Sequence, residues 1–434
     1  MALAPPGERK NKEHTLGAFM AQRTIVGIDV GTTKICTIVA QAHDNGRLNV
    51  LGVGLTPSKG LDRGVVVNID EAVNAISSSI EKAERVSGYR IGTAFVGIAG
   101  RHIASLNSNG VVAVARTDHE ITRQDVARAV ENAQSIAIPN QREVIHVIPR
   151  AYIVDGNQGI RDPVGMSGFR LEVETHIVTG EVMAIQNLIK SVQRGGVEID
   201  DLVLQPLASG EAVLTEDDKD RGVVLVDIGG GTTDIAVFVQ GGIWHTSVLP
   251  VGGNHFTNDI VMVLQTPYHT AEYLKLKYGS AMAGELGDAE EDAIDVEGFS
   301  LGERQKISRH LLNQVIQARA EEVVELVYTE VRRSGYEGML PAGIVLTGGT
   351  SLLPRFDELM RELLSVPVRI GAPSDLHGLA DSLDSPPYAT AVGLVRWGAR
   401  HGIANNNQPP SDGDRERWNT AYERFKGWLR EFLP

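Results

Sequence analysis

Two stretches of the chain share one pattern of apolar and polar positions. Residues 26–39 (VGIDVGTTKICTIV) and 224–239 (VLVDIGGGTTDIAVFV) both pass from an apolar strand through an aspartate and a glycine-containing turn with two threonines into a second apolar strand. The two aspartates, Asp29 and Asp227, lie 198 positions apart, which is about the length of one domain. The repeat predicts a duplicated β-hairpin, and therefore two similar domains that face each other across a cleft.

The rest of the chain mixes helical and extended periods. Apolar residues three and four positions apart predict helices, and β-branched runs predict strands. One of the helices opens with Thr122-x-x-Asp125, a helix-start signal. The predicted helices cover 68–86, 122–134, 181–194 and 307–332, with further helical segments beginning near 253 and 354. The predicted strands cover 90–100, 110–115, 143–154, 171–179 and 343–347.

The C-terminal segment has a pattern of its own. Residues 401–413 are rich in Asn, Pro, Asp and Gly, which is typical of a linker. In 414–434, helical spacing places bulky apolar side chains on one face and charged ones on the other, as in a helix that lies in a membrane interface. The alternative is a terminal helix that packs on its own domain. The residues of the predicted membrane face are Trp418, Tyr422, Phe425, Trp428, Leu429, Phe432 and Leu433.

Composition narrows the possible functions. A length of 434 residues allows two or more domains, and a net charge of −14 argues against nucleic acid as the main partner. The single cysteine, Cys36, excludes an intramolecular disulfide, and its β-branched neighbours indicate a buried structural thiol. Residues 281–297 hold seven acidic and no basic residues, which we interpret as a solvated loop, with a cation site as the alternative. Residues 1–22 contain no apolar secretory segment and are expected to form a flexible arm.

The two glycine-containing turns have the chemistry of a phosphate site. Glycines without Cβ atoms let backbone N–H groups approach an anion, and threonine hydroxyls add further donors. Asp29 and Asp227 would repel a bare triphosphate, so we expect them to contact Mg²⁺ through water. The alternative is that both segments are ordinary hairpin turns.

These motifs together resemble the FtsA family of bacterial cell-division proteins, within the actin/Hsp70 ATPase superfamily. The resemblance covers about 23–400 and the C-terminal segment. The two hairpins and the Gly348-Gly349 turn are shared by the superfamily, whereas 149–168 and 387–394 are typical of the division proteins. The matching motifs are residues 27–34, 149–156, 159–168, 227–234, 343–350 and 387–394.

The resemblance implies an α/β fold: actin-like, duplicated ribonuclease-H-like domains around a nucleotide cleft, with an inserted α+β subdomain and a C-terminal amphipathic helix. The first lobe would comprise 23–89, 174–204 and 385–400, with the insert at 90–173. The second would comprise 205–258 and 341–384, with a helical subdomain at 259–340.

The resemblance also assigns candidate site residues. Glu272 and Lys275 would contact the nucleoside together with Gly348 and Gly349. Lys34 is typical of phosphotransferases in the superfamily, but a local salt bridge is the alternative. The candidate phosphate-binding residues are Gly31, Thr32, Thr33 and Lys34 in the first turn and Gly229, Gly230, Gly231 and Thr232 in the second.

The implied function is that of an ATP- and Mg²⁺-binding protein with weak or no ATPase activity. It would polymerise on the cytoplasmic, anionic lipid surface of the membrane and tether the FtsZ ring there during septum formation. The partners would be further copies of itself, the C-terminal tail of FtsZ (with Arg309 as a candidate contact) and later division proteins. Alternatives are a pilus-assembly actin-like ATPase and a sugar or carboxylate kinase.

Overall fold

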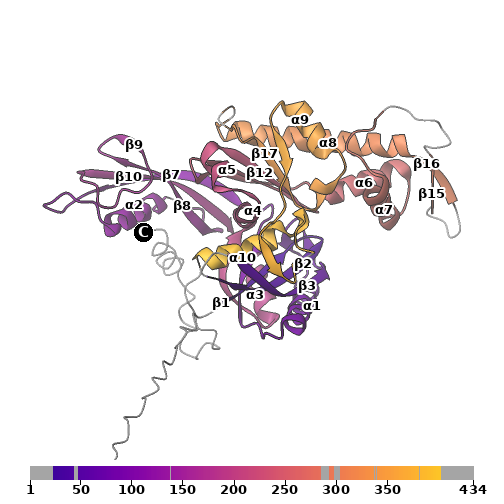
Figure 1. Ribbon diagram of the computed structural model, residues 1–434, viewed down its shortest axis with the longest axis horizontal. Coiled ribbons are helices and arrows are strands. Elements are labelled where there is room, and N and C mark those ends of the chain that lie inside the picture. Colours follow the sequence, from indigo (N-terminus) through magenta and orange to yellow (C-terminus); the bar gives the residue numbers. More distant parts are fainter. Residues whose placement is uncertain are drawn as a thin grey trace, which may run out of the picture.

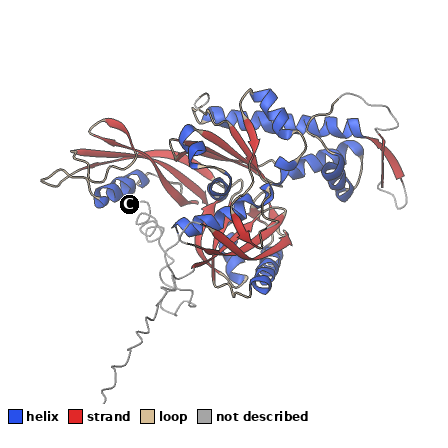
Figure 2. Cartoon of the chain, viewed as in Figure 1, coloured by secondary structure: helices blue, strands red, loops and turns tan. Residues whose placement is uncertain are grey.

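The computed structural model describes residues 23–401 except 44–46, 137, 285–292, 298–303, 337, 339 and 381. Two β-sheets with their helices form the centre of the molecule (Figure 1). A smaller sheet with one helix projects at one end of the long axis, and a helical region projects at the other (Figure 2). The predicted C-terminal helix lies outside the described residues. Within them, no helix has the length and apolar character needed to cross a bilayer.

The first central sheet contains the first predicted hairpin. β1 and β2 are antiparallel, with Asp29 opposite Cys36, while β6 and β11 continue the sheet in parallel beyond β1. Cys36 is fully buried, as its apolar neighbours predict. In spatial order the strands are β11 (Glu198–Leu204), β6 (Thr93–Ile98), β1 (Arg23–Val30), β2 (Lys34–Ala42), β3 (Leu48–Pro57) and β19 (Leu376–Gly378).

The second central sheet repeats this arrangement. β12 and β13 form the second hairpin, with Asp227 opposite Asp234, and β17 and β18 extend the sheet in parallel beyond β12. The predicted duplication is confirmed, because each hairpin occupies the same position in its own sheet. In spatial order the strands are β14 (Gly242–Leu249), β13 (Thr233–Val239), β12 (Val223–Ile228), β17 (Ile344–Thr347) and β18 (Val368–Ile370).

Helices of the first lobe begin and end where local signals predict. The Asn68 side chain accepts a hydrogen bond from Glu71 N at the start of α1, and Gly88 adopts the left-handed conformation (φ 67°) at its end. The apolar faces of the helices in this lobe pack on its sheet. The helices of this lobe are α1 (Ile69–Ser87), α3 (Val182–Arg194) and α10 (Ala389–His401), and a short pair of strands, β4 (Leu61–Asp62) and β5 (Val65–Val66), lies beside them.

The insert is a four-stranded sheet with one helix, α2 (Arg123–Gln134). The predicted capping box is present: Asp125 N donates to Thr122 Oγ1, and Thr122 N donates to the Asp125 carboxylate. The predicted start of the insert at residue 90 requires correction, because β6 pairs with β1 of the first lobe. In spatial order the strands of the insert are β7 (Ala104–Ala113), β10 (Arg170–Glu181), β8 (Arg142–Val154) and β9 (Asn157–Ile160).

The second lobe carries the helical region. Its long helix begins at Arg309, two residues later than predicted, because Arg304–Ser308 forms a strand, β16. β16 pairs with β15 (Ala293–Glu297), so the interpretation of all of 281–297 as a loop is wrong for these five residues. The helices of this lobe are α5 (Glu216–Arg221), α6 (Gly253–Leu264), α7 (Tyr268–Tyr278), α8 (Arg309–Arg333) and α9 (Phe356–Leu364).

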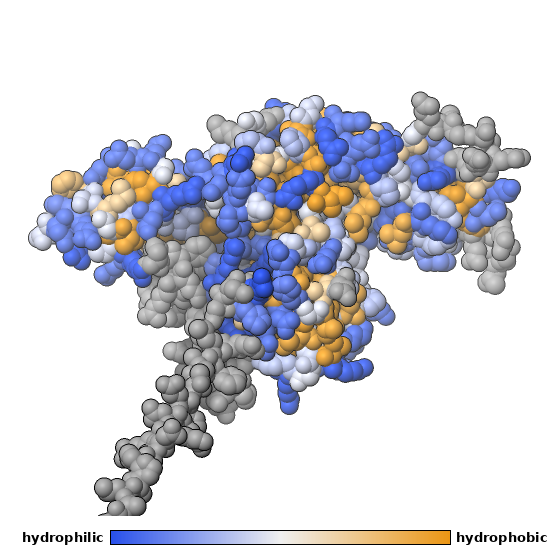
Figure 3. All heavy atoms as spheres, viewed as in Figure 1, coloured by the Kyte–Doolittle hydropathy of each residue, from blue (hydrophilic) through white to orange (hydrophobic). Residues whose placement is uncertain are grey.

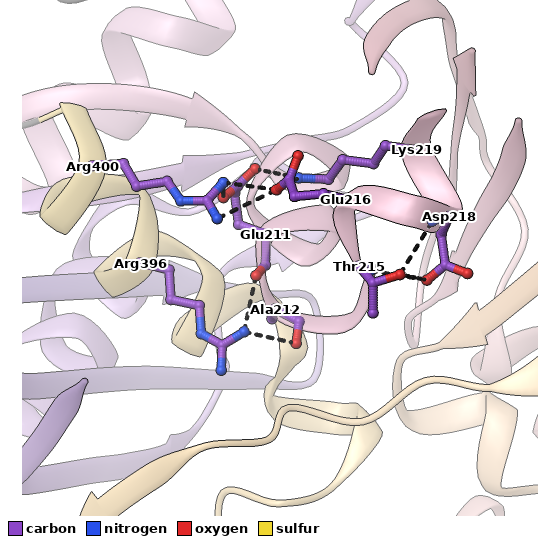
Figure 4. Close-up of polar contacts among 8 residues, drawn as sticks. All are labelled: Glu211, Ala212, Thr215, Glu216, Asp218, Lys219, Arg396 and Arg400. Carbon is purple, nitrogen blue, oxygen red and sulfur yellow. Dashed lines mark hydrogen bonds and ion pairs between the residues drawn. The ribbon is translucent and has the colours of Figure 1, made fainter. Parts of the chain in front are cut away.

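Helices α4 (Gln205–Val213) and α10 join the two lobes. Gly393 of α10 lies against the backbone of Ala208, so close that an added Cβ would stand 1.8 Å from the Ala208 carbonyl oxygen. At the C-terminal end of this contact, Arg396 Nη1 donates to the carbonyls of Glu211 and Ala212, and Arg400 pairs with Glu211 (Figure 4). One hydrophobic core runs through both lobes beside these helices.

The close approach of α10 to α4 predicts that Gly393→Ala destabilises the protein. Alanine would favour the helix by about 1 kcal/mol, but backbone atoms cannot move aside cheaply, and we expect the clash to prevail. The free energy of unfolding should fall by about 1–3 kcal/mol in a urea titration. Gly92→Ala is the matched control, because nothing lies within 4 Å of its Cβ position. Equal stability of the two variants would contradict the packing argument.

Candidate nucleotide site

The two glycine-containing turns have the same internal hydrogen bond. Gly31 N donates to Lys34 O at 3.1 Å in the first, and Gly229 N donates to Thr232 O at 2.9 Å in the second. Within the described residues, the N–H groups of the remaining turn positions donate to no backbone carbonyl. These positions are Thr32 and Thr33 in the first turn and Gly230 and Gly231 in the second. Each turn can therefore offer adjacent N–H donors to an anion.

The two turns lie directly against each other. A Cβ added at Gly230 would stand 2.2 Å from Thr33 Cγ2, and one at Gly231 would stand 2.7 Å from Thr32 Oγ1. This close approach requires glycine in the second turn and places the threonine hydroxyls of the first turn beside it. The predicted phosphate-binding residues of both turns are thus brought together, and a phosphate chain would lie between them only if the turns moved apart.

Asp29 and Asp227 end the inner strands behind these turns, and both are buried. Gln205 Nε2 donates to Asp29 Oδ1 at 3.1 Å. Ser209 Oγ and Thr390 Oγ1 donate to Asp227 Oδ2 at 2.6 and 3.2 Å. The donors come from α4 and from α10, so the helices that join the lobes also fix the carboxylates.

The pKa of Asp29 is raised to about 7, chiefly by burial; the nearby Lys34 ammonium lowers it, and the Asp227 carboxylate raises it by a smaller amount. Burial likewise raises the pKa of Asp227 above its ordinary value, against the lowering effect of its hydrogen bonds from Ser209 and Thr390. Two carboxylates in a buried space favour a cation between them over two bare negative charges.

A third buried carboxylate, Asp234, lies next to the pair. Its Oδ2 accepts a hydrogen bond from Thr232 Oγ1 at 3.2 Å, while Oδ1 has no partner in the described part of the chain. Burial, and next the Asp227 carboxylate, raise its pKa well above the ordinary value. Within the described ranges, no three potential ligands converge closely enough to hold a metal directly. Carboxylate oxygens of this kind are suited to contact a hydrated Mg²⁺ through its waters.

Lys34, the last residue of the first turn, contacts an aromatic ring. Its Nζ lies 3.7 Å from the centroid of the Tyr388 ring. Burial lowers the pKa of Lys34, and the nearby Asp29 carboxylate partly offsets this. Among the residues that the structure describes, the direct partner of the Lys34 ammonium is the Tyr388 ring rather than a carboxylate within 4.0 Å.

The Gly348-Gly349 turn lies beside the second glycine-containing turn. Thr350 Oγ1 donates to Gly229 O at 3.0 Å, and an added Cβ at Gly348 would stand 2.3 Å from Asp227 Oδ1. Gly349, by contrast, has open space around its Cβ position. The predicted nucleoside turn is therefore adjacent to the predicted phosphate turn and leaves room at one glycine.

Glu272 and Lys275 lie on α7 and form an ion pair of 2.7 Å. Lys275 Nζ also donates to Gly253 O at 3.1 Å, and Gly253 N donates to Gly229 O at 2.9 Å. This chain of contacts joins the helical region to the second turn. The structure therefore brings these two candidates to the same site.

Two other groups of candidates lie elsewhere. Arg309 is exposed at the first position of α8. The predicted membrane face, Trp418 to Leu433, lies outside the described residues.

Sequence analysis missed several residues of the site, namely Gln205, Ser209, Asp234, Tyr388 and Thr390. Asp234 and Tyr388 lie in motifs that were recognised, 227–234 and 387–394, and those motifs were the available signal. Gln205 and Ser209 lie on a short apolar helix whose sequence carries no comparable signal.

The raised pKa of Asp29 predicts a pH-dependent stability. Between its ordinary value of 3.8 and about 7, the folded protein binds this proton and the unfolded chain releases it. The free energy of unfolding should therefore fall as pH rises through this range, by about 4 kcal/mol at most from this group. In urea titrations between pH 5 and 8, the free energy of unfolding of Asp29→Asn should fall less steeply with pH than that of the wild type. Some fall should remain, because the pKa values of Asp227 and Asp234 are also raised. If the free energy of unfolding fell equally with pH in the wild type and in Asp29→Asn, the raised pKa of Asp29 would be contradicted.

Comparison with known protein families supports the fold and the insert. A sequence model described as "Cell division protein FtsA" matches residues 224–393. A second, described as "SHS2 domain inserted in FTSA", matches residues 100–179, which begin after β6 as the strand pairing requires.

Solved structures share the fold at low sequence identity. The PilM-PilN type IV pilus biogenesis complex has a TM-score of 0.63 and 16% identity, covering 87% of this chain and 99% of that one. MreB 5 of Spiroplasma citri bound to AMPPNP has a TM-score of 0.54 and 14% identity, covering 87% and 96%. The expected actin-like fold with an inserted subdomain is confirmed.

Relatives in several bacteria are similar over almost their full lengths. Cell division protein FtsA of Pseudomonas aeruginosa is 44% identical over 420 residues, covering 96% of this chain and 99% of the relative. The proteins of the same name from Neisseria meningitidis and Escherichia coli K12 are 42% and 35% identical, each covering 94% of this chain and 98% of the relative. The chain belongs to the FtsA family of cell-division proteins.

Proposed function

We propose that the protein binds ATP with Mg²⁺ between its two glycine-containing turns. The observation that carries the proposal is the direct contact of the turns, Thr33 against Gly230, with N–H groups that donate to no backbone carbonyl of the described residues. The likeness to MreB 5 bound to AMPPNP supports a nucleotide in a fold of this kind.

Each part of the site has a defined role in this proposal. The turn N–H groups and threonine hydroxyls would hold the phosphates, and Asp29 and Asp227 would hold waters of Mg²⁺. The ion would neutralise phosphate charge that these carboxylates would otherwise repel. Gly348 and Gly349 would face the adenosine, with Glu272 and Lys275 at the ribose.

The nucleotide would act mainly as a ligand that sets the separation of the lobes. Because the turns touch, phosphates between them change how far apart the lobes stand, and ATP favours the conformation that fits it. Each lobe also carries a projecting part, the insert on one and the helical region on the other (Figure 1). We propose that these ends contact neighbouring copies in a filament and that hydrolysis is weak or absent.

The helical region is the proposed site for the FtsZ tail. Met262 of α6 and Leu276 of α7 are 77% and 74% exposed. Apolar patches are visible at this end of the molecule (Figure 3). Both helices pack on α8, which begins at the exposed cation Arg309, and exposed apolar and basic side chains suit a peptide that carries both apolar and acidic residues. Other division proteins would bind the insert.

The remaining element of the proposal is membrane attachment. The amphipathic pattern of 414–434 supports a helix that binds the cytoplasmic face of the membrane at the septum, so that the protein tethers the FtsZ ring there. Near-full-length identity of 35–44% to FtsA proteins argues against the pilus-assembly and kinase alternatives.

The ATP site is tested by a side chain placed in the open space at Gly349. Gly349→Leu should fold normally and lower the affinity of the full chain for MgATP at least about tenfold in calorimetric titration, because the side chain would occupy the nucleoside position. Gly92→Leu is the matched control, since Gly92 is also exposed with open space around its Cβ position. Unchanged affinity in Gly349→Leu would contradict the placement of the nucleoside.

Membrane attachment is tested with residues 405–434 fused to a fluorescent protein. We expect the fusion to sediment with anionic lipid vesicles and to lose at least half of this binding when Trp428 is replaced by Glu, because a charge on the apolar face opposes insertion. The control replaces Glu431 on the opposite face with Gln. A wild-type fusion that stays in solution would refute the proposal.

A further inference from the structure

The ammonium group of Lys34 is held by an aromatic ring although carboxylates lie nearby. Asp29 and Asp227 both affect its pKa electrostatically, yet neither forms an ion pair with it. Its direct partner is the face of Tyr388, 3.7 Å from Nζ. A cation over a tyrosine face is attracted by the ring quadrupole, more strongly when both groups are partly desolvated.

The Tyr388 ring is fixed by its neighbours in the chain. It ends the short helix η2 (Pro386–Tyr388), and the Pro386 carbonyl accepts hydrogen bonds of 3.3 Å from Gly348 N and Thr347 Oγ1. Two residues later, Thr390 donates to Asp227. The backbone that carries Tyr388 is therefore held between the nucleoside turn and the buried carboxylate.

Without this ring, the Lys34 ammonium would be expected to form a salt bridge with a nearby carboxylate. The long lysine side chain carries several rotatable bonds, and Asp29 and Asp227 are the carboxylates that act on it electrostatically. A salt bridge to either one would neutralise a carboxylate that the proposed Mg²⁺ requires. It would also remove the ammonium from the phosphates.

We propose that Tyr388 is a positioning residue for Lys34. Its ring face keeps the ammonium away from the two carboxylates and directs it to the phosphate oxygens of the bound nucleotide. The inference rests on the proposed ATP site and adds a residue on which the affinity of that site depends. Because only the ring face is needed, phenylalanine at position 388 should preserve the affinity for MgATP.

The test is a double-mutant cycle in the full-length protein, with MgATP affinity as the measurement. Tyr388→Leu should weaken binding about fivefold, whereas Tyr388→Phe should change it less than about twofold. In a Lys34→Ala background, Tyr388→Leu should have no further effect, because the group that it positions is gone. Tyr328→Leu is the matched control, since Tyr328 also faces a cation, Arg332 at 5.8 Å, but lies on α8.

The outcomes distinguish a failure of the proposed ATP site from a failure of the proposed role of Tyr388. A wild-type protein that does not bind MgATP contradicts the proposed function itself. With wild-type binding intact, additive effects of the two substitutions, or equal losses in the Phe and Leu variants, overturn the role of Tyr388. Should Tyr388→Leu not fold, phenylalanines with increasing fluorination at position 388 keep the shape and weaken the quadrupole. Affinity should then fall stepwise with fluorination, and a constant affinity overturns the inference.

Discussion

The close approach of two glycine-containing turns is the constraint on which the rest of the structure depends. Gly230 and Gly231 can lie against Thr33 and Thr32 only because they have no Cβ atoms. Each turn is held by the hairpin behind it, and each hairpin occupies the same place in its sheet. The duplication thus brings two sets of N–H donors to one place. Helices α4 and α10 join the lobes and hold that arrangement.

Those same helices link the site to the movement of the lobes. Ser209 of α4 and Thr390 of α10 both donate to Asp227, and Gly393 packs on Ala208 nearby. Under the proposed function, a change in lobe separation would change the surroundings of a buried carboxylate, and a ligand at that carboxylate would change the preferred separation. This reciprocity is what a nucleotide-dependent scaffold requires.

Local signals predicted the two hairpins and several long helices, whereas β3, β14, α4 and α10 were not predicted. The duplicated hairpins and the helix start at Thr122 were recognisable because each depends on a few consecutive residues. β6 was predicted as a strand but placed in the insert, because the sequence does not show that its partner is β1. Residues 293–296 alternate between exposed and buried side chains, but their position in an acidic run hid the pattern.

In the site, the turn residues were predictable, whereas Gln205 and Tyr388 reach it from distant parts of the chain. A crystal structure of the full-length protein with MgAMPPNP tests the central claim most directly. The account predicts that the phosphates lie between the two turns, with Thr33 and Gly230 moved apart and the metal's waters on Asp29 and Asp227. A nucleotide bound elsewhere while the turns remain in contact would contradict it.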